Sequence, residues 1–142
     1  MNRAVHRIVP FAAVLALGGC IASNVVKEDD RLVVRPVAQL AFAPAPTLVL
    51  DGLFTSLEIT GDAAVSLRRI WYLFSADGTY TAAALADVEG KPSFQTLNGT
   101  WKNDPAGLSL DGAAPVLLES APDHLRITAP TGVVVLRKEV QQ

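Results

Sequence analysis

Side chains that do acid–base chemistry are few in this 142-residue chain and stand far apart. A hydrolytic triad needs a histidine base held between a nucleophile and an orienting acid, and His124 is the only histidine after residue 20. Its neighbour Asp123 would point to the opposite side of an extended strand. Asp87 and Glu89 have the i, i+2 spacing that places two carboxylates on one side of a strand, but "ALADVEGKPS" around them is typical of a loop. We therefore predict no catalytic residue and interpret these four as surface groups.

Metal, cofactor and nucleic-acid sites are not indicated by the sequence either. A single cysteine excludes an intramolecular disulfide and a cysteine-based metal site. A zinc site around His124 would need further ligands at close spacing, and the sequence has no such pair. The formal net charge of −2 argues against the basic face that nucleic-acid binding requires. We predict no metal, no cofactor and no nucleic-acid partner.

The sole cysteine stands at the end of an N-terminal apolar run. Met1–Arg7 carries two arginines and no acid, and Ile8–Gly19 is almost uninterruptedly apolar. As a helix this run would cover about 18 Å, well short of the bilayer's hydrocarbon core of about 30 Å. A basic start followed by a short apolar run is typical of a secretory signal peptide, which we assign to residues 1–19.

The end of this run resembles the lipobox of bacterial lipoproteins, in which an aliphatic residue and two small residues precede a cysteine. Here these residues are Leu17, Gly18, Gly19 and Cys20. The resemblance implies that signal peptidase recognises the first three and that Cys20 becomes the lipidated first residue, with the membrane as its partner through the acyl chains. Ile21 rather than aspartate follows the cysteine, which in that family points to the outer membrane. The alternative is a buried core cysteine that happens to follow a signal sequence.

The stretch after the cysteine, residues 20–46, is predicted to be a tether. It contains the charge cluster "KEDDR" (Lys27–Arg31) and the proline-rich "PVAQLAFAPAP" (Pro36–Pro46), which favours an extended, stiff spacer. An alternative for Leu32–Val34 is a short strand that pairs with the following domain.

Residues 47–142 are predicted to be all-β, forming a small antiparallel up-and-down barrel of about eight strands. Short apolar segments alternate with turns rich in glycine and proline, and no long helical period occurs. Gly61–Ile70 could hold one helical turn. Closure into a barrel would remove exposed edges. The expected strands are Thr47–Thr60, Leu67–Phe74, Thr79–Leu85, Ser93–Lys102, Leu108–Leu110, Val116–Ser120, His124–Ile127 and Val133–Arg137.

The segment Leu97-Asn98-Gly99-Thr100-Trp101 resembles the G-x-W element of lipocalin-like domains. The resemblance implies that the tryptophan closes one end of the barrel and that glycine permits close packing beside it. In lipocalins this element opens the first strand, whereas here it falls in mid-domain. The aromatic residues Tyr72, Phe74, Tyr80 and Trp101 either line a cavity for an apolar ligand or fill the core, and we favour the filled core because small barrels hold little space.

Together these features predict a lipoprotein of the bacterial cell envelope, anchored through Cys20 and displayed in the periplasm or at the cell surface. Its domain is expected to be a non-enzymatic binding or scaffolding module for an envelope protein. The alternative is a carrier of a small apolar or lipid ligand inside the barrel. The protein-facing role is favoured because the barrel is expected to be full.

Overall fold

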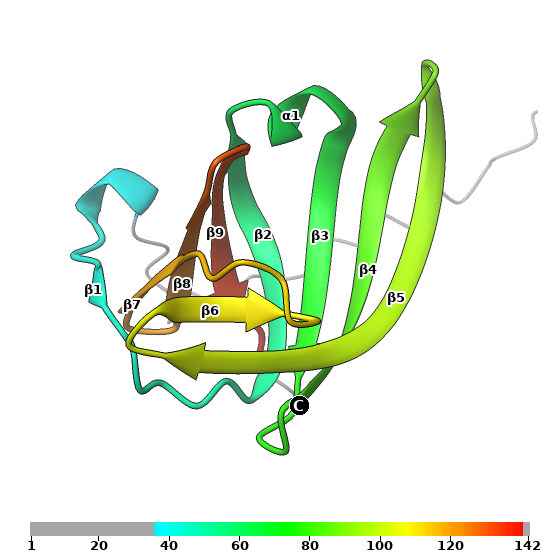
Figure 1. The fold of residues 1–142 in the computed structure, drawn as a ribbon. Helices are drawn as coiled ribbons and strands as arrows, with labels where there is room; N and C mark the ends of the chain where they lie inside the picture. The colour runs from blue at the N-terminus through cyan, green and yellow to red at the C-terminus, as the bar shows by residue number, and fades with distance from the viewer. Residues whose placement is uncertain (1–35, 141–142) are drawn as a thin grey trace, which may run out of the picture. The chain divides into compact units, whose positions relative to one another are not determined.

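One antiparallel sheet of nine strands dominates the computed structural model, which describes residues 36–140 (Figure 1). The order of strands across the sheet is β1-β7-β8-β9-β2-β3-β4-β5-β6. The sheet curls through 284° and forms an open half-barrel. The strands are β1 (Ala43–Pro44), β2 (Gly52–Thr60), β3 (Leu67–Phe74), β4 (Thr79–Val88), β5 (Lys91–Asp104), β6 (Gly107–Leu110), β7 (Leu117–Ala121), β8 (His124–Ala129) and β9 (Gly132–Lys138).

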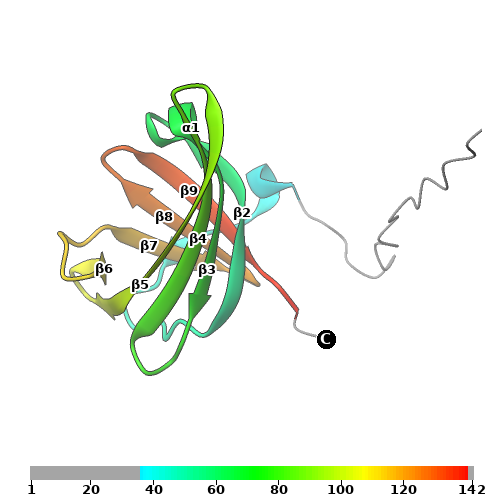
Figure 2. The ribbon, with the colours of Figure 1, turned by 90° about the vertical axis from the view of Figure 1, so that its right-hand side faces the viewer.

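The all-β prediction is confirmed, and the eight expected strands correspond to β2–β9. Neighbours in sequence pair along two meanders, β2 to β6 and β7 to β9, and β9 returns to pair with β2. Seen from the side, β3–β5 and β7–β9 form two walls of the curled sheet (Figure 2). The expected helical turn is also present, as α1 (Ala63–Ser66).

The closed barrel that the sequence predicted is corrected to a half-barrel. Between β6 and β7 the described residues make only one isolated bridge, in which Leu108 and Val116 exchange backbone hydrogen bonds of 2.8 and 2.9 Å. The strand β6 is only four residues long, and Pro115 before the bridge has no N–H to donate. Both features prevent a continuous ladder of backbone hydrogen bonds between β6 and β7, which would have closed the sheet into a barrel.

The last part of the predicted tether lies against the sheet. Residues 37–39 form a 3₁₀ turn, η1 (Val37–Gln39), and β1 pairs with β7 through Ala43–Ser120 and Pro44–Glu119. A proline suits such an edge strand because its missing N–H is not needed there. The folded part of the chain therefore begins before Thr47. The alternative strand Leu32–Val34 lies outside the described residues.

The core is built from the inward faces of the strands. On β3, Ile70, Tyr72 and Phe74 point into the core, whereas Leu73 between them is 46% exposed, as period-2 alternation requires. Leucines from β6 to β9 and from the segment before β2 complete the core. Those with at most 2% of their surface exposed are Leu50, Leu108, Leu118, Leu125 and Leu136.

Candidate functional site

The four aromatic residues that the sequence singled out come together inside the half-barrel. Tyr72 and Phe74 on β3 stack at 5.2 Å between ring centroids, and Tyr80 on β4 lies 6.1 Å from Phe74. Trp101 on β5 meets Phe74 edge to face at 6.2 Å. Phe74 and Tyr80 are 1% and 5% exposed. These rings therefore pack against one another, and offset and edge-to-face contacts of this kind stabilise a core.

Asp111, which sequence reasoning missed, holds one end of this aromatic cluster. The Tyr80 hydroxyl donates to its Oδ2 at 2.7 Å, and the backbone N–H of Thr100 donates to its Oδ1 at 2.8 Å. A Cβ on Gly99 would overlap this carboxylate. The element therefore needs a glycine at position 99, because the carboxylate of Asp111, in the turn after β6, occupies the space beside it. The sequence carries no signal for this contact, because Asp111 and Tyr80 are distant along the chain.

These contacts shift the acid–base equilibria of the two partners in opposite directions. Burial, followed by the hydrogen bond to Asp111, raises the pKa of Tyr80. The hydrogen bonds from Tyr80 and from the Thr100 N–H lower the pKa of Asp111 below its ordinary value. The pair is therefore a neutral phenol that donates to a charged carboxylate, which is a strong, charge-assisted hydrogen bond.

The tryptophan of the same element is bound to the β3–β4 turn. The Trp101 indole N–H donates to the Ser75 carbonyl oxygen at 2.9 Å, and its backbone N–H donates to the Gly78 carbonyl at 2.8 Å. The ring thus satisfies its only polar group while it packs edge to face with Phe74.

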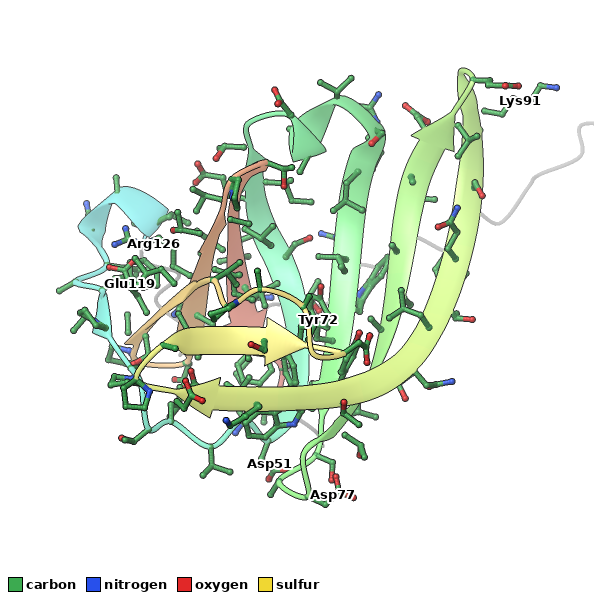
Figure 3. All side chains as sticks on the ribbon, viewed as in Figure 1. Asp51, Tyr72, Asp77, Lys91, Glu119 and Arg126 are labelled. Atoms are coloured by element: carbon green, nitrogen blue, oxygen red, sulfur yellow. The ribbon has the colours of Figure 1, made fainter. Side chains whose placement is uncertain are left out.

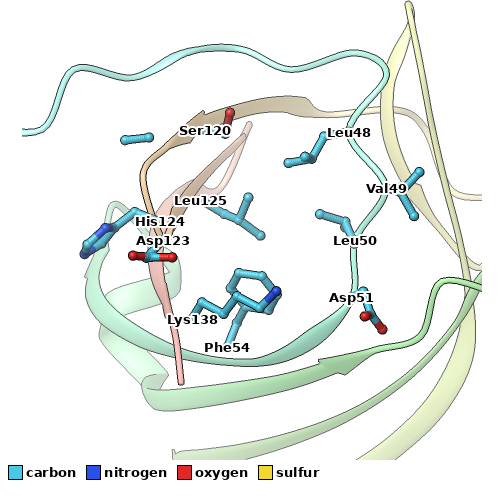
Figure 4. A pocket seen from close by; sticks show the side chains of 11 residues that line it. Leu48, Val49, Leu50, Asp51, Phe54, Ser120, Asp123, His124, Leu125 and Lys138 are labelled. Carbon is cyan, nitrogen blue, oxygen red and sulfur yellow. The ribbon is translucent and has the colours of Figure 1, made fainter. Parts of the chain in front are cut away.

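His124 and Asp123 line a shallow pocket of about 220 Å³ at the β7–β8 turn (Figure 4). The strand alternation expected for these two residues does not apply, because Asp123 lies in the turn with a left-handed φ of 59° and β8 begins only at His124. The His124 Nδ1 donates to the Pro122 carbonyl oxygen at 2.7 Å. Within residues 36–140 no hydrogen bond joins the imidazole to Asp123 or to Ser120 on the same rim.

This pocket is small and has an apolar floor. Leu50, Phe54 and Leu125 form the floor, and the charged side chains of Asp51 and Lys138 stand on the rim (Figure 4). Its volume is below the roughly 300–1,000 Å³ typical of pockets for drug-sized ligands. A second shallow pocket of about 230 Å³ lies where β1 meets the β5–β6 turn. None of the four core aromatics lines either pocket.

Asp87 and Glu89 are not held together as a pair. Asp87 belongs to β4, not to the predicted loop, and its carboxylate is bound by the guanidinium of Arg68 across the sheet. Glu89 occupies the following turn with a φ of 52° and is exposed. Asp87 thus serves as the partner of Arg68.

A second ion pair connects β7, β8 and the segment before β1. Arg126 donates to both carboxylate oxygens of Glu119, at 2.6 and 2.8 Å, and its guanidinium lies 4.5 Å from the centre of the Phe42 ring (Figure 3). The Arg126 guanidinium holds the pKa of Glu119 below its ordinary value. Such a two-pronged pair has defined geometry, which indicates a structural role in seating residues 36–46.

The lipobox residues Leu17, Gly18, Gly19 and Cys20 lie outside the described residues. Within residues 36–140 there is no cluster of three side chains suited to hold a metal ion, and no helix there is long and apolar enough to cross a membrane.

Comparison with known proteins yields no relative. No protein-family model matches the chain, and neither a curated protein nor a solved structure matches it. Statements about function therefore rest on the residues themselves.

Proposed function

We propose that this chain is a lipoprotein of the bacterial envelope whose half-barrel acts as a non-enzymatic binding or scaffolding module for a protein partner. The observation that carries the proposal is the packing of the core aromatics: Phe74 and Tyr80 are buried against each other and against Trp101. Side chains that fill the interior are not available to a ligand there, which favours recognition through the outer faces and edges of the sheet.

The anchor is proposed from the order of residues around Cys20. A thioether-linked diacylglyceryl group needs a free thiol at the membrane surface, and Gly18 and Gly19 leave the backbone before it accessible. Each buried CH₂ adds about 0.8 kcal/mol, so two or three acyl chains give stable attachment. With Ile21 next to the cysteine, we place the protein at the outer membrane by analogy with that family.

The test of the anchor is Cys20→Ser in the full chain, expressed in a Gram-negative host. We expect the variant to lose its acyl mass and to move from the membrane to the soluble fraction, whereas Ala22→Ser, a matched change two residues away, stays in the membrane. Tight membrane retention of Cys20→Ser with an unchanged mass would refute the lipobox assignment.

A second candidate function, transport of a small apolar or lipid ligand, is favoured by one observation. Leu97 lies on the inward face of β5, opposite Ala82, yet it is 48% exposed because the half-barrel is open beside it. A lipocalin-like architecture, which the Gly99–Trp101 element resembles, would suit this function, and Trp101 at the end of the half-barrel agrees with it.

Native mass spectrometry separates the two functions. The full chain is purified gently from the envelope, and its mass is compared before and after denaturation. A reproducible non-covalent added mass that disappears on denaturation would favour the carrier. A mass equal to the acylated chain alone favours the filled interior and the protein-binding module.

A further inference from the structure

The longest strand of the sheet has a free edge. On one side β5 pairs with β4 from Lys91 to Thr100, and on the other side it pairs with β6 only from Trp101 onward (Figure 1). Within residues 36–140, no strand borders the second side of residues 91–100. Most proteins protect such an edge with charges or bulges, but between Pro92 and Thr100 this edge carries no charged side chain, and Phe94 is 63% exposed.

The hydrogen bonds around the end of this segment establish which backbone groups face the free side. The Trp101 N–H points toward β4, since it donates to Gly78 O, whereas Thr100 points the other way and exchanges its N–H and C=O with Asp111. Backbone groups alternate sides along a strand. Phe94, Thr96 and Asn98 therefore present their N–H and C=O groups to the free side.

We propose that this edge pairs antiparallel with the same edge of a second copy, about a two-fold axis at Thr96. In this register Thr96 lies opposite Thr96 of the second copy, and Phe94 lies opposite its Asn98. All N–H and C=O groups that these residues expose then bond to one another. The unpaired backbone of an edge recognises an extended chain, and a two-fold axis makes one edge complementary to itself.

Pro92 at one end of the segment and Asp111 at the other set where the new ladder ends. With the axis at Thr96, Pro92, which has no N–H, lies opposite Thr100, whose N–H and C=O are already engaged by Asp111. With the axis at Gln95, Pro92 would instead lie opposite Asn98 and leave the Asn98 carbonyl without a donor. Each register therefore leaves one carbonyl of each copy without a donor at the end of the ladder, that of Pro92 with the axis at Thr96 and that of Asn98 with the axis at Gln95. The cross-links below distinguish the two registers.

Charge at the two ends of the segment agrees with the same arrangement. Lys91 stands exposed at the tip of the β4–β5 turn (Figure 3), and Asp111 stands at the other end of the free edge, over Gly99. Lys91 and Gly99 both belong to the inward-facing set of alternate residues. Antiparallel pairing thus brings Lys91 of one copy to the Asp111 end of the other, on the same face of the sheet.

A single-thiol cross-link tests the pairing. The full chain with Cys20→Ser and Thr96→Cys is oxidised and examined on a non-reducing gel, and the control carries Thr131→Cys, at an exposed turn far from β5. Directly opposite residues in a hydrogen-bonded pair lie about 5.5 Å apart between Cα atoms, within the range of a disulfide. We expect a dimer for Thr96→Cys only. A monomer, or equal dimer from the control, overturns the proposal, as would occupation of this edge by residues 1–35 or by another protein.

The register has its own test. Phe94→Cys mixed with Asn98→Cys, both with Cys20→Ser, should form a mixed disulfide, because these positions oppose each other. Phe94→Cys alone should not, since the two copies of residue 94 would be offset by about 13 Å along the strand. Dimer from Phe94→Cys alone, or none from the mixture, excludes the register.

Sedimentation of variants without new thiols completes the experiment. Thr96→Pro removes the central N–H, which is not used inside the sheet, and should weaken dimerisation about tenfold or more. Thr96→Val keeps that N–H and should dimerise as the parent does. Equal dimerisation of both variants contradicts the proposal. Since Cys20→Ser removes the proposed lipid acceptor from every sample, failure of the anchor leaves this result unaffected.

Discussion

Asp111 explains why the G-x-W element has a glycine at position 99, because its carboxylate occupies the space that a side chain there would need. Gly99 admits its carboxylate, Thr100 donates a backbone N–H to it, and Tyr80 donates its hydroxyl. Two strands, β4 and β5, and the turn after β6 thus meet at one acid. Because its partners stabilise the charged form, the folded state binds a proton on Asp111 less readily than the unfolded chain does.

This arrangement predicts a pH-dependent stability. A carboxyl whose pKa is lowered on folding contributes stability above its unfolded pKa of about 4, and this contribution is lost as the pH falls through the folded pKa. Tyr80→Phe removes the largest cause of the lowering. We expect the variant to have a smaller free energy of unfolding at pH 7 and the deficit to shrink below about pH 4.

Urea unfolding followed by tryptophan fluorescence at pH 7, 5 and 3 measures this difference. Tyr72→Phe is the matched control, since its hydroxyl makes no hydrogen bond within residues 36–140, and its effect should not vary with pH in this range. A Tyr80→Phe deficit that stays constant from pH 7 to pH 3 would mean that Asp111 is not the linked group.

At the scale of the elements, two consecutive alanines on β4 face opposite sides of the sheet. Ala82 is 2% exposed and lies opposite Tyr72 and Leu97, whereas Ala83 faces outward opposite Trp71 and Thr96. The carrier hypothesis treats Ala82 as the wall of a void. The packing around Phe74 and Tyr80 instead makes it part of a filled core.

The filled core predicts different outcomes for the same substitution at the two alanines. Ala82→Leu should lower the free energy of unfolding by about 1–3 kcal/mol, because a packed core does not accept added methylenes without strain. Ala83→Leu should change it by less than about 0.5 kcal/mol, as is usual at partly exposed sites. Denaturant titration of both variants measures the contrast, and a neutral Ala82→Leu would reveal unfilled space beside the residue.

At the scale of the whole molecule, the sheet is held together by its first long strand and its last. Pairs such as Ile59–Val134 and Ser56–Leu136 join β2 to β9. The two residues of each pair are far apart in sequence. The contacts between β2 and β9 therefore form only after much of the chain between them has been ordered. Topologies dominated by such distant pairs fold slowly.

We therefore expect refolding in milliseconds to seconds rather than microseconds. Stopped-flow fluorescence of Trp71 and Trp101 can follow it, and Trp101 reports the packing of the aromatic cluster. Leu136→Ala, at the β2–β9 seam where the side chain is 0% exposed, should also destabilise the fold by about 2–5 kcal/mol. Refolding complete within microseconds would show that local hairpins, not this seam, limit the rate.

The sequence by itself determined the features that depend on neighbours along the chain. The strands β2–β9 follow from alternating apolar residues between glycine and proline turns, and the lipobox resemblance at Cys20 follows from adjacent small residues. Strand identity and face are local properties, because side chains alternate with every residue.

Only the tertiary structure decided what depends on contacts between distant segments. It paired Ala43 and Pro44 with β7, left the barrel open between β6 and β7, and placed Asp123 and His124 beside one pocket. It also brought Asp111 to Tyr80 and left one edge of β5 free. Pairing partners, register and the ends of a ladder are set by long-range geometry, which no local pattern of residues records.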